Sequence, residues 1–490
     1  MKALFEALAA VPAGQTVLAG ADADWDGPAI RRDIDTLRRQ LSDCRVLAVL
    51  ADNNPAWVIA DLAALEAEWT HLPLPTFFSP AQLAYTLALS AADACLSDQP
   101  ERIEALNIGF HRRGQWNGLT LLQRKIVAAQ LPPGTAKISF TSGSTGEPKG
   151  VCLSAAGLAA TAAAVAARLH DIPVERHLAV LPLALLLENV AGIYAPLLRG
   201  ATVSVPPLAT LGWQGMAGFN PAALHQSVAA HDAHSVILVP ELAKAWFLFL
   251  AASGQQAPQS LKFVAVGGAR VDADLLQRCR ALGMPLYQGY GLTECGSVVS
   301  LNRPGDDADG VGRPLDHARI RIDADEVCVQ TPAFLGYLGE QHSNPADEVR
   351  TGDLGHLDAA GHLHLDGRRK NLLITSYGRN ISPEWLESLL LAEPAVAQAM
   401  VAGESRPWLC ALLVPLPGQR EAELDAAVTR VNARLPDYAR IGAWLPCPPF
   451  ALKDGLATGN GRPIRTAIAA HYAAAIESLY AEGETRRVVL

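Results

Sequence analysis

Short apolar runs alternate with amphipathic stretches along the early part of the chain. Val46–Leu50 is a continuous apolar run, and residues 55–67 follow with helical spacing and a proline in the first turn. Ser79 precedes a further helical segment, Pro80–Leu89, where a serine side chain can cap free backbone N–H groups. Strands that alternate with helices in this way are typical of parallel sheets covered by helices, so the pattern predicts an α/β fold.

The same alternation continues further along the chain. Residues 235–240 form an apolar run ahead of a helical segment that begins at Glu241. A second run, at 261–266, leads directly into Gly267, Gly268 and Ala269. Open α/β sheets bind ligands at the carboxyl ends of their strands. These glycines therefore mark a candidate ligand loop, although a Gly-Gly-Ala sequence alone is a weak signal.

The strongest candidate for chemistry lies between an apolar run at 137–140 and an alanine-rich helical run at 155–169. It consists of Thr141, Ser142, Gly143, Ser144, Thr145, Gly146, Glu147, Pro148, Lys149 and Gly150. Small residues let backbone N–H groups converge on an anion, hydroxyls add donors, and the lysine adds a charge. The glycine spacing differs from that of the P-loop of nucleotide hydrolases. The flanking apolar runs argue against the alternative, a flexible Ser/Gly linker.

Composition limits the class of protein. The chain has 490 residues, of which 50% are hydrophobic and 18% are charged, which indicates a globular protein with more than one domain. The formal net charge is −9. Because nucleic-acid binding needs a basic face, we expect no nucleic-acid partner.

No stretch of the sequence is typical of a membrane or secretory segment. The most apolar stretch, at 178–198, is interrupted by Pro182, Glu188, Asn189 and Pro196, and the first residues carry a carboxylate at Glu6. The 8 cysteines stand singly, without a spacing that suggests zinc. We therefore expect a cytoplasmic protein without a transmembrane segment, and the sequence leaves its oligomeric state open.

Further motifs carry carboxylates next to glycines. Residues 287–294 end in Thr293 and Glu294, and a carboxylate beside a hydroxyl suits magnesium, which also takes phosphate oxygens. Tyr290 in the same run offers a flat face for a base. Asp353 lies in the turn-like run 350–355, and a carboxylate can accept two O–H donors at once. A basic run that includes Arg368 and Lys370 follows.

In their order and residues, these motifs resemble the signatures of the acyl-adenylate-forming superfamily, which includes AMP-forming acyl-CoA synthetases and adenylation domains. The run at 366–384 is most similar to the long-chain acyl-CoA synthetase branch. The resemblance implies a large N-terminal domain of stacked α/β subdomains, residues 1–366, and a small mobile C-terminal α/β lid domain, residues 367–490. The hinge is expected near 368–370, with Lys370 as its pivot.

The resemblance also implies residue roles. Catalysis is assigned to Arg462, Lys149, Thr293 and Glu294, and magnesium to Glu294. The residues expected to bind ATP or AMP are Thr141, Ser142, Gly143, Ser144, Thr145, Gly146, Lys149, Gly267, Gly268, Ala269, Gly289, Tyr290, Gly291, Thr293, Asp353 and Arg368. Arg462 occupies the position of the family's usual lysine, and an arginine keeps the charge but has a larger, planar head.

The reaction implied is ATP-dependent activation of a carboxylic acid to an acyl-adenylate, with release of pyrophosphate. Transfer to a thiol would follow, either to coenzyme A or to the phosphopantetheine arm of an acyl carrier protein, and the motifs do not distinguish the two. The expected cofactors are thus ATP, magnesium and coenzyme A or that arm. The alternatives are an aryl-acid ligase, including one that forms amides, and a non-catalytic nucleotide-binding relative.

The acid pocket is expected to be apolar. The residues predicted to line it are Leu185, Val239, Gly291 and Val298. Leu185 stands where long-chain relatives carry histidine, and Gly291 stands where the acetate-activating branch carries tryptophan. A glycine there would leave the pocket open, which argues against acetate. Apolar walls suit a fatty acid or an aromatic acid, and the similarity of the hinge to the long-chain branch favours a fatty acid.

Overall fold

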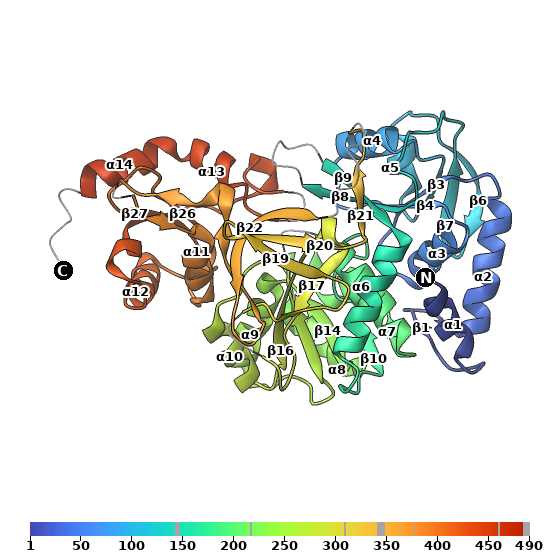
Figure 1. The fold of residues 1–490 in the computed structure, drawn as a ribbon, viewed down its shortest axis with the longest axis horizontal. Coiled ribbons are helices and arrows are strands. Elements are labelled where there is room, and N and C mark those ends of the chain that lie inside the picture. Colours follow the sequence, from blue (N-terminus) through green and yellow to red (C-terminus); the bar gives the residue numbers. More distant parts are fainter. Residues whose placement is uncertain are drawn as a thin grey trace.

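The structure of the protein is a computed structural model that describes residues 1–142, 148–215, 218–307, 310–340, 348–376, 378–458 and 461–483. A C-terminal α/β unit lies at one end of the longest axis and one large sheet at the other, and the second large sheet and a smaller antiparallel sheet lie between them (Figure 1). This mixed α/β architecture confirms the fold class predicted from the sequence.

The larger sheet is parallel through its middle, with antiparallel strands at both ends. Its strands, in spatial order, are β18 (Arg313–Pro314), β17 (Ser297–Leu301), β16 (Leu286–Leu292), β15 (Phe263–Val266), β14 (Ser235–Leu238), β10 (Arg176–Leu178), β11 (Thr202–Ser204), β1 (Leu18–Ala19) and β2 (Asp24–Trp25).

The other large sheet contains the strands on both sides of the Ser/Gly-rich loop, and these two strands pair antiparallel. Its order is β21 (Phe334–Tyr337), β9 (Pro148–Ser154), β8 (Thr135–Ser142), β4 (Thr70–Pro73), β3 (Val46–Leu50), β5 (Ala94–Ser97), β7 (Leu119–Gln123) and β6 (His111–Trp116). A smaller antiparallel sheet consists of β19 (Arg319–Asp323), β20 (Glu326–Gln330), β22 (Val349–Leu357) and β23 (Leu363–Arg368).

Helices fill the space between the two large sheets and cover their outer faces (Figure 1). In this region they are α1 (Lys2–Ala10), α2 (Gly27–Gln40), α3 (Pro55–Glu66), α4 (Pro80–Leu89), α5 (Pro100–Glu104), α6 (Ala155–Arg168), the π-helix η1 (Glu188–Tyr194), α7 (Ala195–Leu198), α8 (Pro221–Ala230), α9 (Pro240–Ser253) and α10 (Ala273–Ala281). Short elements complete it: η2 (Leu208–Leu211), η3 (Thr293–Cys295), β12 (Trp213–Gln214) and β13 (Gly218–Phe219).

The C-terminal unit has a sheet and apolar clusters of its own. Its elements are η4 (Arg369–Asn371), β24 (Leu373–Ile374), β25 (Asn380–Ile381), α11 (Pro383–Ala392), β26 (Val396–Ala402), β27 (Leu409–Pro415), α12 (Glu421–Asn432), η5 (Asp437–Ala439), β28 (Ile441–Pro446), η6 (Leu452–Asp454), α13 (Arg465–His471) and α14 (Ala473–Gly483). The boundary at 366 and the hinge at 368–370 stay predictions.

Local sequence explains where several helices begin. At α4 the backbone N–H of Gln82 donates to Ser79 Oγ at 3.2 Å, and the Gln82 side chain accepts from the Ser79 N–H at 3.0 Å. This reciprocal capping satisfies N–H groups that a helix start leaves free. Ser154 caps α6 in a similar way, through a 2.9 Å bond from Gly157 N. The helix therefore starts directly after strand β9.

The apolar stretch at 178–198 folds as the end of β10, a turn, η1 and α7. Among the described helices, none has the length and apolarity needed to cross a bilayer. Glu188 in η1 is fully buried, and its carboxylate accepts a 2.9 Å bond from the Leu181 N–H and contacts His177 Nε2 at 2.9 Å. Its two oxygens are thus used within the core.

Candidate active site

The Ser/Gly-rich loop is placed only at its two ends. Gly143, Ser144, Thr145, Gly146 and Glu147 lie outside the described residues, as does the side chain of Ser142. Thr141 in β8 faces Lys149 in β9 across the ladder, and its hydroxyl donates to the Lys149 carbonyl at 3.4 Å. The strands on either side of the loop therefore hold its ends together.

The Lys149 side chain extends over Tyr337 of the neighbouring strand β21. Its Nζ lies 3.3 Å from the centre of the Tyr337 ring and 3.0 Å from Glu340 Oε1. An ammonium over an aromatic face is held by the ring quadrupole. Lys149 is nevertheless 44% exposed and Glu340 57% exposed, so this ion pair is weak.

Glu294 shares the same tyrosine. The Tyr337 hydroxyl donates to Glu294 Oε1 at 3.0 Å, and Glu294 lies in the 3₁₀ turn η3 beside Thr293. Burial, and then the adjacent Glu294 carboxylate, raise the pKa of Tyr337 above its ordinary value, so the hydroxyl stays protonated and donates. Tyr337 thus joins the predicted metal ligand to the predicted phosphate lysine, a link that sequence reasoning missed.

Magnesium fits this arrangement as a nucleotide-bound ion. Among the residues that the structure describes, no group of three or more His, Cys, Asp or Glu side chains is arranged to hold a metal. Magnesium commonly takes only one or two protein carboxylates and fills its shell with water and phosphate oxygens. Glu294, with one oxygen fixed by Tyr337, matches that donor set.

A second cluster joins Tyr290, Asp353 and Arg368. The Tyr290 hydroxyl donates to Asp353 Oδ2 at 2.7 Å, and Arg368 Nε lies 2.8 Å from Oδ1. Asp353 is 5% exposed. Its burial raises its pKa, and the Arg368 guanidinium and the Tyr290 hydroxyl oppose this change. Both carboxylate oxygens thus have protein donors, and each retains lone pairs for a further O–H donor.

The predicted glycine loop lies next to this cluster. Gly267 and Gly268 follow β15, and Gly268 has a φ of +94°, a left-handed conformation that favours glycine. Arg462 from the C-terminal unit donates to the Gly268 carbonyl at 2.9 Å. Arg462 is solvent-exposed, yet the protein around it lowers the pKa of its guanidinium, and the Glu241 carboxylate opposes this. The structure therefore brings Arg462 to the predicted nucleotide loop.

The residues predicted for the acid pocket are partly brought together. A side chain at Gly267 would lie 3.6 Å from Leu187, and one at Gly268 would lie 3.8 Å from Val239. Leu187, two residues after the predicted Leu185, is thus the leucine of this segment that lies beside the glycine loop. Sequence reasoning missed it because the resemblance pointed to the position of the histidine.

The backbone of the paired strand leaves no room for a side chain at Gly291. A Cβ at this position would lie 1.6 Å from the Ser297 carbonyl oxygen of the paired strand β17. Since any side chain here would collide with backbone, the glycine carries no information on the depth of the acid pocket. Val298, predicted as a pocket wall, is buried in the main apolar cluster.

The remaining predicted residues have simpler surroundings. Gly289 lies in β16, where a Cβ would meet Ser300 O at 3.1 Å. Lys370 is exposed within η4, and Ala269 follows Gly268 before α10. Their predicted roles are untested by these contacts.

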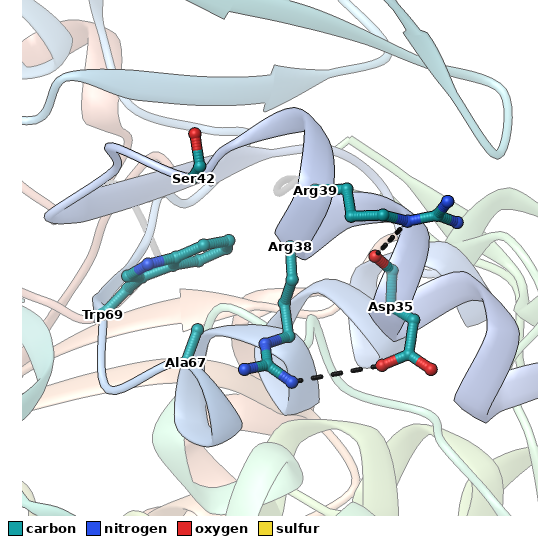
Figure 2. A pocket seen from close by; sticks show the side chains of 6 residues that line it. All are labelled: Asp35, Arg38, Arg39, Ser42, Ala67 and Trp69. Carbon is teal, nitrogen blue, oxygen red and sulfur yellow. Dashed lines mark hydrogen bonds and ion pairs between the residues drawn. The ribbon is translucent and has the colours of Figure 1, made fainter.

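A separate surface pocket of about 600 Å³ lies between the end of α2 and the residues after α3 (Figure 2). Its lining residues are Asp35, Arg38, Arg39, Ser42, Ala67 and Trp69. None of the sequence-predicted site residues lines it. Arg39 Nε donates to the Asp35 carbonyl at 3.2 Å, and Arg38 lies 4.0 Å from the Asp35 carboxylate. The pocket is therefore distinct from the candidate active site.

Comparisons with known proteins identify relatives. A family model described as AMP-binding enzyme matches residues 36–338, and one described as AMP-binding enzyme C-terminal domain matches residues 370–484. The chain is 31% identical over 297 residues to a 2-succinylbenzoate–CoA ligase of Bacillus velezensis, a match that covers 56% of each chain. It is 31% identical over 246 residues to a long-chain-fatty-acid–CoA ligase of Mycobacterium bovis, covering 44% of this chain and 41% of that one. The chain thus spans about half the length of these two curated relatives.

Among solved structures, the anthranilate CoA ligase AuaEII in complex with anthranoyl-AMP has a TM-score of 0.79 at 18% identity and covers 96% of this chain and 98% of its own. Such a likeness concerns the fold. The predicted place in the long-chain branch is wrong, because the match to the aryl-acid ligase covers more of both chains at the same identity. The superfamily assignment itself is confirmed: the chain belongs to the family of AMP-binding enzymes.

Proposed function

We propose that the protein is an AMP-forming acid–thiol ligase, which activates a carboxylic acid with ATP and then transfers the acyl group to coenzyme A. The observation that carries the proposal is the grouping of Lys149, Tyr337 and Glu294 beside Tyr290 and Asp353, within a chain matched by both family models. Lys149 would offer positive charge to the phosphates, and Glu294 would offer a carboxylate to the magnesium ion that they bind. Asp353 would offer acceptors to the ribose hydroxyls.

In the first half-reaction, a carboxylate oxygen of the acid attacks the α-phosphorus of ATP. The bond from that phosphorus to the bridging oxygen breaks, and pyrophosphate leaves with the electron pair. Chemistry of this kind depends on positioning and charge neutralisation. Lys149 would leave Glu340 for the phosphates, and Arg462 would bring a second cation toward the reacting groups. Magnesium on Glu294 would supply further neutralisation of the phosphate oxygens.

Asp353 and its partners would hold the nucleoside. Tyr290 and Arg368 fix the carboxylate through both of its oxygens, and its remaining lone pairs would accept from the two ribose hydroxyls. This fixed orientation reduces the freedom that the nucleotide must lose on binding. The ring of Tyr290 would flank the base.

In the second half-reaction, the thiol of coenzyme A attacks the acyl carbon, the thioester bond forms and AMP leaves. The C-terminal unit would turn about Lys370 between the two steps, which would carry Arg462 away from the glycine loop. Exposed polar residues at the start of that unit can absorb such a change in φ and ψ. Transfer to a carrier-protein arm is the alternative second step.

For the acid itself we favour an aromatic monocarboxylic acid over a fatty acid. Its support is that a curated relative matched by the chain is a 2-succinylbenzoate–CoA ligase, whose acid carries an aromatic ring, together with the uncharged side chains of Leu187 and Val239 beside the glycine loop. A second carboxylate, as in 2-succinylbenzoate, would need a cation of its own, and Arg462 at the same loop is already assigned to the reacting groups.

Pyrophosphate release over a panel of acids tests this proposal. The panel would contain benzoate, anthranilate, 2-succinylbenzoate and straight-chain fatty acids from acetate to palmitate. We expect the aromatic monocarboxylic acids to have the highest kcat/KM. Highest kcat/KM with a long fatty acid would contradict the substrate class and leave the reaction class standing. No release with any acid would favour the non-catalytic alternative.

A further inference from the structure

The carbonyl end of α11 in the C-terminal unit is docked onto a lysine of the N-terminal region. Lys244 of α9 donates from Nζ to the Glu393 carbonyl at 2.7 Å and to the Val396 carbonyl at 2.5 Å. Lys244 is 8% exposed. A buried lysine whose hydrogen bonds go to backbone carbonyls of another domain is unusual for simple packing, which apolar residues satisfy without a desolvation cost.

Further contacts strengthen this docking. Arg278 of α10 donates to the Ala392 carbonyl at 3.4 Å, and its guanidinium lies 4.7 Å from the centre of the Phe247 ring on α9. Ala392 itself packs into the apolar cluster that contains α9 and α10. A cation of the C-terminal unit also pairs with the N-terminal region, since Arg434 lies 2.8 Å from the Asp274 carboxylate of α10.

Backbone hydrogen bonding explains why these donors lie where they do. The last carbonyls of α11 have no partner within the helix. Burying them against another domain is costly unless that domain supplies donors. In this orientation Arg278 supplies a donor to the carbonyl of Ala392, the last residue of α11, and Lys244 supplies donors to the carbonyls of Glu393, which follows the helix, and Val396, which begins β26. Burial lowers the pKa of Lys244 to about 7, with Glu393 opposing and Arg278 adding to the change.

The same orientation places Arg462 within 2.9 Å of the Gly268 carbonyl. We propose that Lys244, assisted by Arg278, is a positioning residue that holds the C-terminal domain in the adenylate-forming orientation. This inference rests on the proposed function, in which the domain turns away before the thiol step. Loss of the lysine shifts the balance between two domain orientations and so affects the two half-reactions differently.

The test compares Lys244→Met with Lys262→Met. Methionine keeps most of the apolar stem and removes the donor, and Lys262 is an exposed lysine just before β15 in the N-terminal region. Single-turnover rates are measured for acid-dependent pyrophosphate release, with the best acid of the panel, and for transfer of the pre-made acyl-adenylate to coenzyme A. Lys244→Met is expected to slow the first step about ten- to a hundredfold and to leave the second unchanged or faster. Lys262→Met is expected to change neither.

A second readout is independent of catalysis. Fluorophores on cysteines introduced at Val127, which is 88% exposed, and at the exposed Glu421 report the distance between the two domains. Lys244→Met is expected to populate a second distance that the parent pair lacks. Arg278→Met, at an exposed position, is expected to populate the second distance to a smaller extent. This variant replaces Lys244→Met in the test if Lys244→Met does not fold.

The outcomes separate the inference from the proposed function. A new distance population in Lys244→Met supports the docking role, even if no acid gives pyrophosphate release and the proposed function fails. An unchanged distance distribution, or equal slowing of both half-reactions, overturns the role of Lys244 and leaves the proposed function untouched.

Discussion

At the scale of single residues, the site depends on one tyrosine that serves two charged neighbours. Tyr337 donates to Glu294 through its hydroxyl and holds Lys149 over its ring. The two contacts use different parts of the side chain, so two substitutions can separate them. The sequence gives no local signal for this link, because the three residues come from β21, η3 and β9.

Tyr337→Phe should loosen Glu294 while keeping the aromatic face under Lys149. A hydrogen bond to a charged group contributes about 1.5–3 kcal/mol, so we expect a higher magnesium requirement and a fall in kcat of about tenfold or more. Tyr337→Leu removes the ring as well, and we expect it also to raise the KM for ATP. Titrations of magnesium and ATP on both variants make the comparison, and identical profiles for the two would refute separate roles.

Arg462 is the residue at which the chain departs from its family, and it lies at the glycine loop. Removing one preorganised charged donor costs about 3–4 kcal/mol in the step that uses it. Arg462→Ala should therefore slow adenylate formation about a hundred- to a thousandfold and leave transfer from a pre-made acyl-adenylate nearly normal. Arg462→Lys should retain activity. If Arg462→Ala forms adenylate at the normal rate, another cation is responsible, and Lys453 in η6 is the next to test.

At the scale of elements, the docking of α11 controls where the C-terminal unit lies. At this contact Lys244 donates to the Glu393 carbonyl and lies near the charges of Glu393 and Arg278. Arg430 of α12 donates from Nε to the Glu393 carboxylate at 2.9 Å. Burial lowers the pKa of the docked Lys244 to about 7. Undocking that returns the lysine to solvent raises its pKa toward the ordinary value of about 10.4, so docking releases a proton between these values.

This release predicts the pH dependence of docking. Below pH 7 the lysine is protonated in both states and its desolvation opposes docking in full. Between about pH 7 and 10 the undocked state binds the extra proton, so rising pH favours docking by up to about tenfold per unit. The domain-distance probe should report more of the docked state at pH 9 than at pH 7 in the parent protein. A slope of equal size in Lys244→Met would assign the effect to another group.

At the scale of the whole molecule, the sequence predicted the strands and helices whose signals lie within a few consecutive residues. Apolar runs and caps located β3, α3 and α4, because a capping serine and a continuous apolar run act over a few residues. Strand order was not predictable in this way. β21 pairs with β9, and β1 pairs with β11, and these partners are far apart in sequence.

Sequence motifs predicted the residues of the candidate site. The contacts that join residues of different elements were not predicted. Asp353 contacts Tyr290 and Arg368, and Glu294 contacts Tyr337; the roles of these residues toward a nucleotide stay predictions. Gly291 had been interpreted as an open pocket, and the close approach of Ser297 gives it another reason. Such a reason depends on the register of two paired strands, which local sequence does not reveal.

The central claim is that the chain forms an acyl-adenylate at the site that contains Glu294. Exchange of labelled pyrophosphate into ATP measures this step directly, since the exchange requires the reversible attack of a carboxylate on the α-phosphorus. We predict exchange that depends on the added acid and on magnesium, and that is lost in Glu294→Ala while circular dichroism shows an intact fold. Absence of exchange with every acid, or undiminished exchange in Glu294→Ala, would contradict the account.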